Sequence, residues 1–327
     1  ILTRQIIDRG FVNQYGINLT YKLFPGQLSS SMLAGLICSA QTGVGPGTVQ
    51  DYAARHSMYP INTFKTRDKD IYKTDTKTGE KTYLKTITVP GFKDIKERYD
   101  DSFWNGVTVE MYREYGNVDA GTANLIYGVP EVLSFSLLYY REDIFDKYNL
   151  TIPNVWDDYY TYIPTLQKYN MQAEAPQAGV MIYQYGGLMY KYDNSRQANA
   201  RASNIDSDLY LKLFDKQNAF YTEYKCPITM DGHSRFRTGE VPMIIGTLST
   251  WKNLYAQAPE IRGLWKFHIL PGVEQEDGTV NREQIPTVTY SAIYAAGANH
   301  DGAWEFIQWF NDYECSNEFG REVEALI

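Results

Sequence analysis

Cysteine is scarce in this sequence, and its few cysteines are far apart. They are Cys38, Cys226 and Cys315, and no pair has the CxxC spacing. Paired cysteines carry the zinc-ribbon and thioredoxin-type motifs, so neither motif is expected. We interpret the three as small, buried apolar residues, a set that does not decide between a reducing and an oxidising compartment.

Histidine is equally sparse, which bears on metal binding. The four histidines are His56, His233, His268 and His300, and none stands at ligand spacing from a neighbouring cysteine, histidine or acidic residue. A zinc site needs three or four such ligands brought together. We therefore expect neither a metal nor a cofactor.

Long apolar runs and positive charge are also missing. The longest apolar stretches, around Leu133–Leu138 and Val241–Ile245, have the length of strands, whereas a membrane span needs about 18 apolar residues. Net charge is −8, from 31 basic and 39 acidic residues, and the pI is about 5.2. This charge argues against a nucleic-acid partner. No signal peptide is visible, and ILTRQIIDRGF resembles the middle of a helix, so we expect a fragment or a mature segment.

What is present is an ordered series of strands and helices around Tyr127–Trp156. The chain has 327 residues, enough for two lobes. The apolar run Val132–Leu138 predicts a strand buried on both faces, followed by an amphipathic helix within Tyr139–Tyr148. Pro153-Asn154 then stops the chain, and a helix opens at Trp156, with a kink expected at Pro164.

Other segments give simpler patterns. Alternation of Ile17, Leu19, Tyr21 and Leu23 predicts a strand, and 178–184 also begins like one. The Lys- and Thr-rich segment 65–89 predicts a solvated hairpin that turns at Thr78-Gly79. Helices are expected over 1–15, 206–224 and the segment HDGAWEFIQWFND. Strands are expected at VPMIIG, KFHILPGV and TVTYSAIYAAG.

Three motifs occur in an order that is informative. They are YGVPE…LLYYREDIFDKYNLTIPNVWDD, FRTGEVPMIIG and SAIYAAGANHDGAWEFIQWF. Together they resemble the family 1 extracellular solute-binding proteins of bacterial ABC importers. The resemblance implies an α/β, periplasmic-binding-protein-like fold of type II, with two hinged lobes and a ligand cleft. It also implies ABC permease subunits as partners, an extracytoplasmic location and a monomer.

The segments LSSSMLAGL, RFRTGE, APEIRGLW and FGREVEAL look closer to one branch of that family. There the binding module lies within a larger, lipid-anchored surface lipoprotein of Gram-positive bacteria. Against the family pattern, both ends of the fold look trimmed. Gly45-Pro46-Gly47 stands where Gly-Pro-Asp is usual, and Val155 replaces a helix cap, which leaves Asn154 as the expected cap.

The resemblance predicts where the lobes divide. Lobe 1 is expected to be 1–128 plus 274–327, with 65–89 as an insertion, and lobe 2 is expected to be 129–273. The crossings between lobes are then near Val129 and over Phe267–Pro271. Glu131 follows directly after the first crossing.

A sugar site needs aromatic faces for the C–H side of the ring and planar polar groups for its hydroxyls. The resemblance places Glu131 at the cleft as a hydroxyl acceptor, with a hinge salt bridge as the alternative. It places Trp251 as a stacking platform, with helix packing as the alternative, whereas Arg237 is expected to be a structural clamp. The remaining candidate ligand-binding residues are Gln27, Ser29, Ser30, Ser134, Phe135, Tyr185, Thr289 and Tyr290.

These features predict a non-catalytic receptor that clamps a carbohydrate, with an oligosaccharide favoured, and delivers it to a permease. Two alternatives stay open. One is a surface or signalling module whose cleft no longer binds. The other is a glycosidase using Glu131 and Asp143, although no HExxH or GxSxG motif supports an enzyme.

Overall fold

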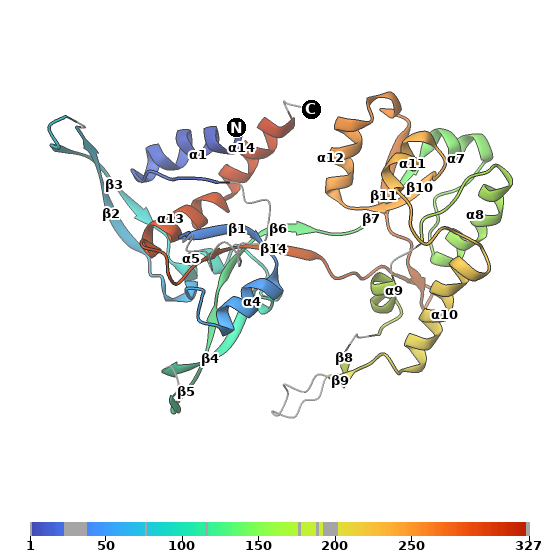
Figure 1. Cartoon of the computed structure of the whole chain (residues 1–327), viewed down its shortest axis with the longest axis horizontal. Helices are drawn as coiled ribbons and strands as arrows, with labels where there is room; N and C mark the ends of the chain where they lie inside the picture. Colours follow the sequence, from blue (N-terminus) through green and yellow to red (C-terminus); the bar gives the residue numbers. More distant parts are fainter. Residues whose placement is uncertain are drawn as a thin grey trace. The chain divides into compact units, whose positions relative to one another are not determined.

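The computed structural model describes residues 2–22, 38–75, 77–114, 117–175, 178–187, 190–191 and 202–324 (Figure 1). The chain divides into two compact units. Unit 1 consists of Ile1–Leu133 and Val288–Ile327, and unit 2 is the continuous segment Ser134–Thr287. The lobe limits given above, 128/129 and 273/274, stay a prediction.

Unit 1 is built around a three-stranded sheet in the order β1-β14-β6, with helices packed against it. Strand β1 is antiparallel to β14. Its strands are β1 (Ala40–Val44), β2 (Arg67–Thr74), β3 (Lys81–Val89), β4 (Thr108–Glu114), β5 (Asn117–Ile126), β6 (Gly128–Ser134) and β14 (Thr287–Ile293). Its helical elements are α1 (Leu2–Ile7), η1 (Asp8–Val12), α2 (Asn13–Tyr15), α4 (Pro46–Ala54), η2 (Ile61–Thr63), α5 (Phe92–Lys96), α6 (Ser102–Asn105), α13 (His300–Phe310) and α14 (Tyr313–Glu324).

The N-terminal helix confirms the sequence prediction. Helical turns run from α1 through η1 to α2, and the chain leaves them at Gly16, whose φ of 65° suits glycine. Phe11 is buried against Tyr15 and Phe306, with ring centroids 5.1 and 5.5 Å away. This aromatic contact joins the first helical segment to α13.

The strand predicted at residues 17–23 was wrong over its described part. Residues 17–22 have no strand pairing, although their side chains do alternate between half-buried and exposed. Ile17, Leu19 and Tyr21 pack on the unit 1 core, and the residues between them face solvent. The alternation therefore reflects one-sided burial of an extended segment rather than a sheet.

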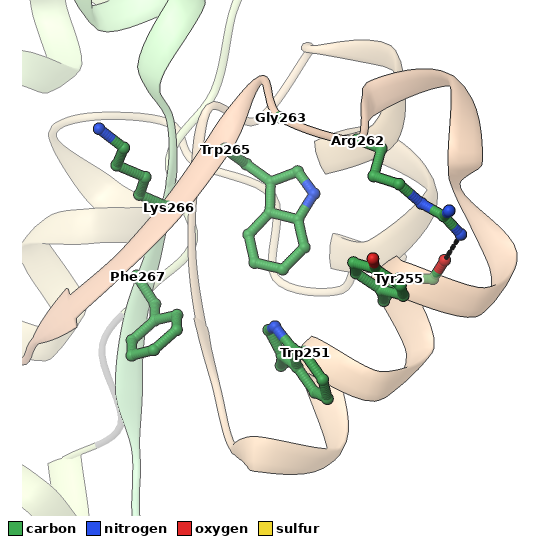
Figure 2. Close-up of a pocket in the computed structure, with 7 residues that line it drawn as sticks. All are labelled: Trp251, Tyr255, Arg262, Gly263, Trp265, Lys266 and Phe267. Carbon is green, nitrogen blue, oxygen red and sulfur yellow. Dashed lines mark hydrogen bonds between the residues drawn. The ribbon is translucent and has the colours of Figure 1, made fainter. Parts of the chain in front are cut away.

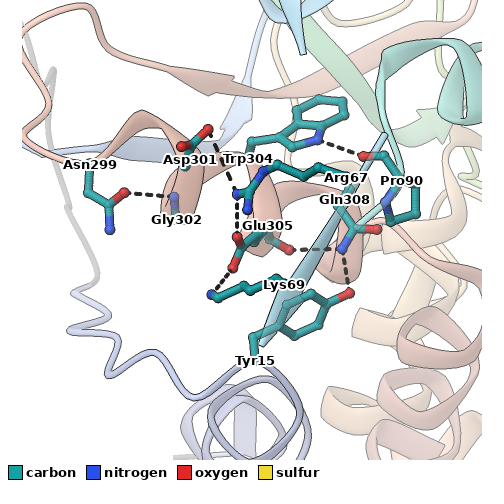
Figure 3. A network of polar contacts seen from close by, with 10 residues as sticks. All are labelled: Tyr15, Arg67, Lys69, Pro90, Asn299, Asp301, Gly302, Trp304, Glu305 and Gln308. Carbon is teal, nitrogen blue, oxygen red and sulfur yellow. Dashed lines mark hydrogen bonds and ion pairs between the residues drawn. The ribbon is translucent and has the colours of Figure 1, made fainter. Parts of the chain in front are cut away.

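The hairpin predicted within 65–89 is confirmed. Strands β2 and β3 pair antiparallel from Arg67↔Val89 to Thr74↔Lys81, and the hairpin extends away from the sheet of unit 1 (Figure 1). Near its base, Arg67 and Lys69 each contact the carboxylate of Glu305 at 2.5 Å. Glu305 is only 1% exposed, so this pairing fixes the hairpin to α13 (Figure 3).

Unit 2 is built around a second three-stranded sheet, in the order β10-β7-β11, with both outer strands antiparallel to β7. Its strands are β7 (Leu137–Arg141), β8 (Tyr190–Lys191), β9 (Ala202–Ser203), β10 (Met243–Gly246), β11 (Trp265–Ile269), β12 (Val273–Glu274) and β13 (Val280–Asn281). Its helical elements are α7 (Glu142–Tyr148), α8 (Trp156–Lys168), α9 (Ala178–Gln184), α10 (Asp208–Thr222), α11 (Gly232–Thr238), α12 (Leu248–Gln257) and η3 (Pro259–Ile261).

The apolar run after Glu131 does not form one buried strand, which corrects the prediction. It is split between β6 and β7, and Val132 and Phe135 are about half exposed, at 52% and 47%. The strand buried on both faces is β7, whose five residues are all buried. Tyr139 to Arg141 therefore belong to this strand, and helix α7 begins only at Glu142.

Two further predictions in unit 2 were wrong. Residues 178–184 form helix α9 instead of a strand, although the turn at Gly186-Gly187 is present. Helix α8 has Val155 as its N-cap residue instead of Asn154, because the Asp158 carboxylate accepts hydrogen bonds from both backbone N–H groups there. This helix continues through Pro164.

Candidate ligand-binding site

Unit 2 contains a cavity of about 300 Å³ between helix α12 and strand β11. It is lined by Trp251, Tyr255, Arg262, Gly263, Trp265, Lys266 and Phe267. Figure 2 shows Trp251 and Tyr255 projecting from α12, and Trp265 and Phe267 projecting from β11. We call these seven residues the aromatic pocket. Of the residues predicted from the sequence, Trp251 is the one that lies in it.

The α12 side of the pocket is a stack of flat groups. The Trp251 and Tyr255 rings are one helical turn apart, with centroids 5.5 Å apart and planes at 26°. The guanidinium of Arg262 lies over the Tyr255 ring, 4.2 Å from its centroid, and donates a hydrogen bond of 2.9 Å to the Tyr255 carbonyl. Trp251, Tyr255 and Arg262 are therefore held in a fixed order along one wall.

A close approach at its N-terminus positions α12. The Thr250 hydroxyl accepts a hydrogen bond of 3.1 Å from the backbone N–H of Thr247. A Cβ atom on Gly246 would lie 2.3 Å from that hydroxyl, so the turn from β10 into α12 requires glycine at this position. The pocket wall thus depends on a residue without a side chain.

Strand β7 supports the opposite wall. The buried Tyr139 ring lies 5.8 Å from Trp265 and 5.9 Å from Phe267, centroid to centroid, and its hydroxyl donates to the Thr247 carbonyl at 2.6 Å. Burial raises the pKa of Tyr139, which keeps the hydroxyl a donor. One β7 side chain therefore contacts both β11 and the start of α12.

The two cations of the pocket differ in their partners. Lys266 forms an ion pair with Glu142 on α7, whereas in the described part of the chain no carboxylate forms an ion pair with Arg262. The carboxylate nearest to it in sequence, Glu260, is paired with Arg237. This pairing also agrees with the structural role predicted for Arg237.

Glu131 lies in unit 1, on β6, and is tied to two neighbouring segments. Its Oε2 atom accepts hydrogen bonds from the Gly43 N–H at 2.6 Å and from the Ser291 hydroxyl at 2.9 Å. Burial raises the pKa of this carboxyl, while the two hydrogen bonds act in the opposite direction. Among the described residues no cation pairs with Glu131, so the hinge salt bridge considered above is not seen.

The other predicted site residues have varied surroundings. On β14, Thr289 is half-buried, whereas Tyr290 is 2% exposed and its hydroxyl donates to the Phe103 carbonyl at 2.7 Å. Packing therefore accounts for Tyr290 without a ligand. Ser134 is half-buried at the end of β6, and Phe135 beside it is exposed.

Tyr185 follows helix α9 in unit 2 and carries two cations over its ring. The Nζ atoms of Lys212 and Lys216 lie 5.8 and 5.6 Å from the ring centroid. Lys216 is also paired with Asp157 at 2.9 Å. Tyr185 thus links α9 to α10. Gln27, Ser29 and Ser30 lie outside the described residues.

Five aromatic or basic pocket residues were not predicted: Tyr255, Arg262, Trp265, Lys266 and Phe267. A signal for three of them was present in the sequence. Tyr255 stands four residues after Trp251, a spacing that faces one way on a helix. Trp265 stands two residues before Phe267, just ahead of the strand expected at KFHILPGV, and that spacing faces one way on a strand. Arg262 lies in the segment APEIRGLW, quoted above for one branch of the family, but nothing there marked it as a pocket residue, because its position depends on the turn after η3.

Neither a cluster of potential metal ligands nor a helix that could span a membrane occurs among the described residues. No group of three or more His, Cys, Asp or Glu residues suited to a metal ion occurs among the described residues. Nor is any helix in the described ranges long and apolar enough to span a membrane. The pocket and the surroundings of Glu131 therefore remain the principal ligand-binding candidates.

Sequence comparison identifies the family. The profile described as "Bacterial extracellular solute-binding protein" matches residues 63–314, well over half of the chain. The chain belongs to this family. The solute-binding protein is accordingly of an extracellular type, as the motifs predicted. No curated protein matches its sequence.

Solved structures confirm the fold of this solute-binding protein. An ABC transporter solute-binding protein of Thermotoga lettingae, solved with α-D-tagatose, has a TM-score of 0.67 at 16% identity, covering 99% of this chain and 76% of that one. A transporter-associated binding protein of B. animalis subsp. lactis, solved with β-1,6-galactobiose, gives 0.62 at 16%, covering 98% and 72%. A maltose-maltodextrin-binding protein of Alicyclobacillus acidocaldarius gives 0.61 at 12%, covering 99% and 76%. The predicted α/β periplasmic-binding-protein-like fold is confirmed.

Proposed function

We propose that this solute-binding protein is the carbohydrate receptor of an ABC importer, with an oligosaccharide as its ligand. The observation that carries the proposal is the aromatic pocket. Four rings, from Trp251, Tyr255, Trp265 and Phe267, line one cavity. Flat aromatic faces suit the apolar side of a sugar ring. The solved relatives named with tagatose, galactobiose and maltose add support.

Within this proposal Trp251 is the main stacking surface. Its ring is half-buried and already stacked on Tyr255, so little side-chain entropy is lost when a sugar contacts it. The same stack serves as helix packing, which was the alternative role. Trp251 can both stack on a sugar and pack within α12. Substitution of Trp251 separates the two roles, because loss of stacking lowers ligand affinity and loss of packing lowers the stability of the fold.

Glu131 is proposed as a hydroxyl acceptor. Both of its hydrogen bonds end on Oε2, which leaves Oε1 to accept from a ligand hydroxyl. The bonds from Gly43 and Ser291 orient the carboxylate before any ligand arrives. Ser134, Phe135, Tyr185 and Thr289 stay further candidates for ligand contact.

We also propose that the full-length protein is attached to the outer surface of the cell by a lipid, and that its ligand-bound form docks as a monomer on ABC permease subunits. The extracellular family and two relatives named as ABC transporter proteins support this location and partner. The further proposal of a module within a larger lipoprotein rests on the four sequence segments given above.

A non-catalytic role is proposed over a glycosidase. The second carboxylate of that alternative, Asp143, receives two hydrogen bonds from Arg141, at 2.8 and 2.7 Å. These bonds hold the pKa of Asp143 below its usual value, which is the opposite of what a general acid needs. Incubation with oligosaccharides followed by product analysis should show binding without cleavage.

The experiment for the receptor function is a ligand screen. Thermal unfolding should be followed with maltotriose, cellotriose, xylotriose and galactobiose, each over a range of concentrations. A specific ligand raises the melting temperature with concentration, because it binds only the folded state. A screen in which no saccharide moves the transition would overturn the proposal and favour a surface module with a degenerate cleft.

A further inference from the structure

The aromatic pocket contains one cation whose charge is not compensated. Lys266 is paired with Glu142, whereas in the described part of the chain Arg262 has no charged partner and contacts the neutral ring and carbonyl of Tyr255. The neighbouring carboxylate, that of Glu260, forms an ion pair with Arg237. A positive charge therefore remains at the pocket of a protein whose net charge is −8.

Arg262 is also held in place before a ligand binds. Its guanidinium stacks on the Tyr255 ring, and its Nη2 atom donates to the Tyr255 carbonyl at 2.9 Å. Figure 2 shows the side chain lying along the α12 wall, at the end of the Trp251–Tyr255 stack. An arginine fixed in this way loses little side-chain entropy when it binds an anion, and its remaining N–H groups form a planar fork.

We propose that the ligand is an acidic oligosaccharide, whose uronate carboxylate binds Arg262 while a sugar ring stacks on Trp251. This inference rests on the proposed carbohydrate receptor and adds the charge of the ligand. A planar carboxylate matches the guanidinium fork, and charge-assisted hydrogen bonds are the stronger ones. Arg262 thereby determines the preference for acidic over neutral sugars.

The test uses matched pairs of acidic oligosaccharides and their methyl esters. The two members of a pair differ only in the charge of their uronate carboxyl groups. The probes are trigalacturonate, oxidised cellotriose and oxidised maltotriose with uronate units, and hyaluronan oligosaccharides. Calorimetric titration should show that at least one acid binds the protein roughly tenfold more tightly than its ester, and that salt weakens the difference.

Variants assign the preference to the residue. Arg262→Gln should remove the preference, so that the acid binds no more tightly than its ester, and Arg262→Lys should keep part of the preference, since the charge stays but the fork is lost. The control is Arg235→Gln, which changes a partly exposed arginine on α11 that is paired with Glu240 and does not line the pocket. It should change neither affinity.

Three outcomes are distinguishable. A protein that binds neutral oligosaccharides or esters at least as well as the acids overturns the acidic ligand and leaves the receptor function standing. A preference for acids that survives in Arg262→Gln overturns the assignment to this residue. Absence of binding to every acid, ester and neutral sugar overturns the receptor function as well.

Discussion

Trp251 stacks on Tyr255 across one turn of α12, with ring centroids 5.5 Å apart. The relationship gives one prediction about binding and one about stability. Trp251→Ala should weaken binding of the ligand found in the screen by tenfold or more, about 1.4 kcal/mol, because the stacking surface is lost. Titration calorimetry and quenching of tryptophan fluorescence measure this effect.

The matched control is Phe214→Ala, which removes an exposed aromatic side chain from α10, outside the pocket. It should leave affinity unchanged. Retained affinity in Trp251→Ala, together with a lowered melting temperature, would assign Trp251 to helix packing alone.

Glu131 gives a prediction about how stability depends on pH. Burial raises the pKa of Glu131 above its ordinary value of 4.5, so the folded protein binds this proton more tightly than the unfolded chain does. The protonated group therefore favours folding, and this contribution is lost as pH rises through the folded pKa. The glutamine in Glu131→Gln cannot ionise, so the variant does not lose this contribution. As pH rises above 4.5, the urea midpoint of the variant should therefore increase relative to that of the parent protein. A difference that stays constant with pH would contradict the buried carboxylate.

Asp143 supplies the comparison of opposite sign. Hydrogen bonds from Arg141 lower the pKa of Asp143 below its ordinary value of 3.8, so its ionised form favours folding at neutral pH. Asp143→Asn should cost about 1–2 kcal/mol of unfolding free energy there, since Arg141 loses its carboxylate partner. The cost should vanish as pH falls below 3.8 and through the folded pKa. Urea unfolding across a pH series measures both variants, and parallel pH trends in the two would refute the assignment.

Glu305 gives a prediction about stability. Glu305→Gln leaves Arg67 and Lys69 without the charge they share, and it should cost about 3 kcal/mol of unfolding free energy. Glu314→Gln, an exposed glutamate on α14, is the control and should stay within about 0.5 kcal/mol.

The mechanism behind that cost has its own test. Methionine at all three positions, 67, 69 and 305, removes the buried charge with its partners, and it should recover most of the lost stability, because buried ion pairs are often replaceable by apolar groups. A triple variant less stable than Glu305→Gln would point to packing by the long polar side chains as the main contribution.

Side-chain patterns in the sequence predicted element types well where local chemistry and tertiary context agreed. The helix ending at Gly16 and the hairpin turning at Gly79 both have glycine at positive φ. Because glycine favours this conformation, both chain reversals are recognisable from the residue type alone. Patterns of burial were less reliable guides. The alternation of Ile17, Leu19 and Tyr21 reflects packing on a core without any strand partner. Pairing depends on distant residues, which no local pattern contains.

The candidate site was predicted only in part for a related reason. Trp251 followed from the family resemblance, but the pocket around it forms where a helix lies against a strand that is connected through η3. The position of Arg262 depends on that connection. Conversely, Tyr290 had the chemistry of a sugar-binding residue, but its hydroxyl is satisfied by the Phe103 carbonyl inside the core. Residue type indicates what a side chain can bind, whereas packing decides whether it is accessible.

The order of strands in unit 1 has a consequence for how the chain acquires its structure. The middle strand of the sheet β1-β14-β6 is β14, which comes after the whole of unit 2 in the sequence. During synthesis, β1 and β6 therefore emerge long before the strand that joins them, and Arg67 likewise emerges long before Glu305. Unit 2 is continuous and can fold first, so the last part of the chain to appear completes the first part. Until then the unpaired edges of β1 and β6 need protection from aggregation.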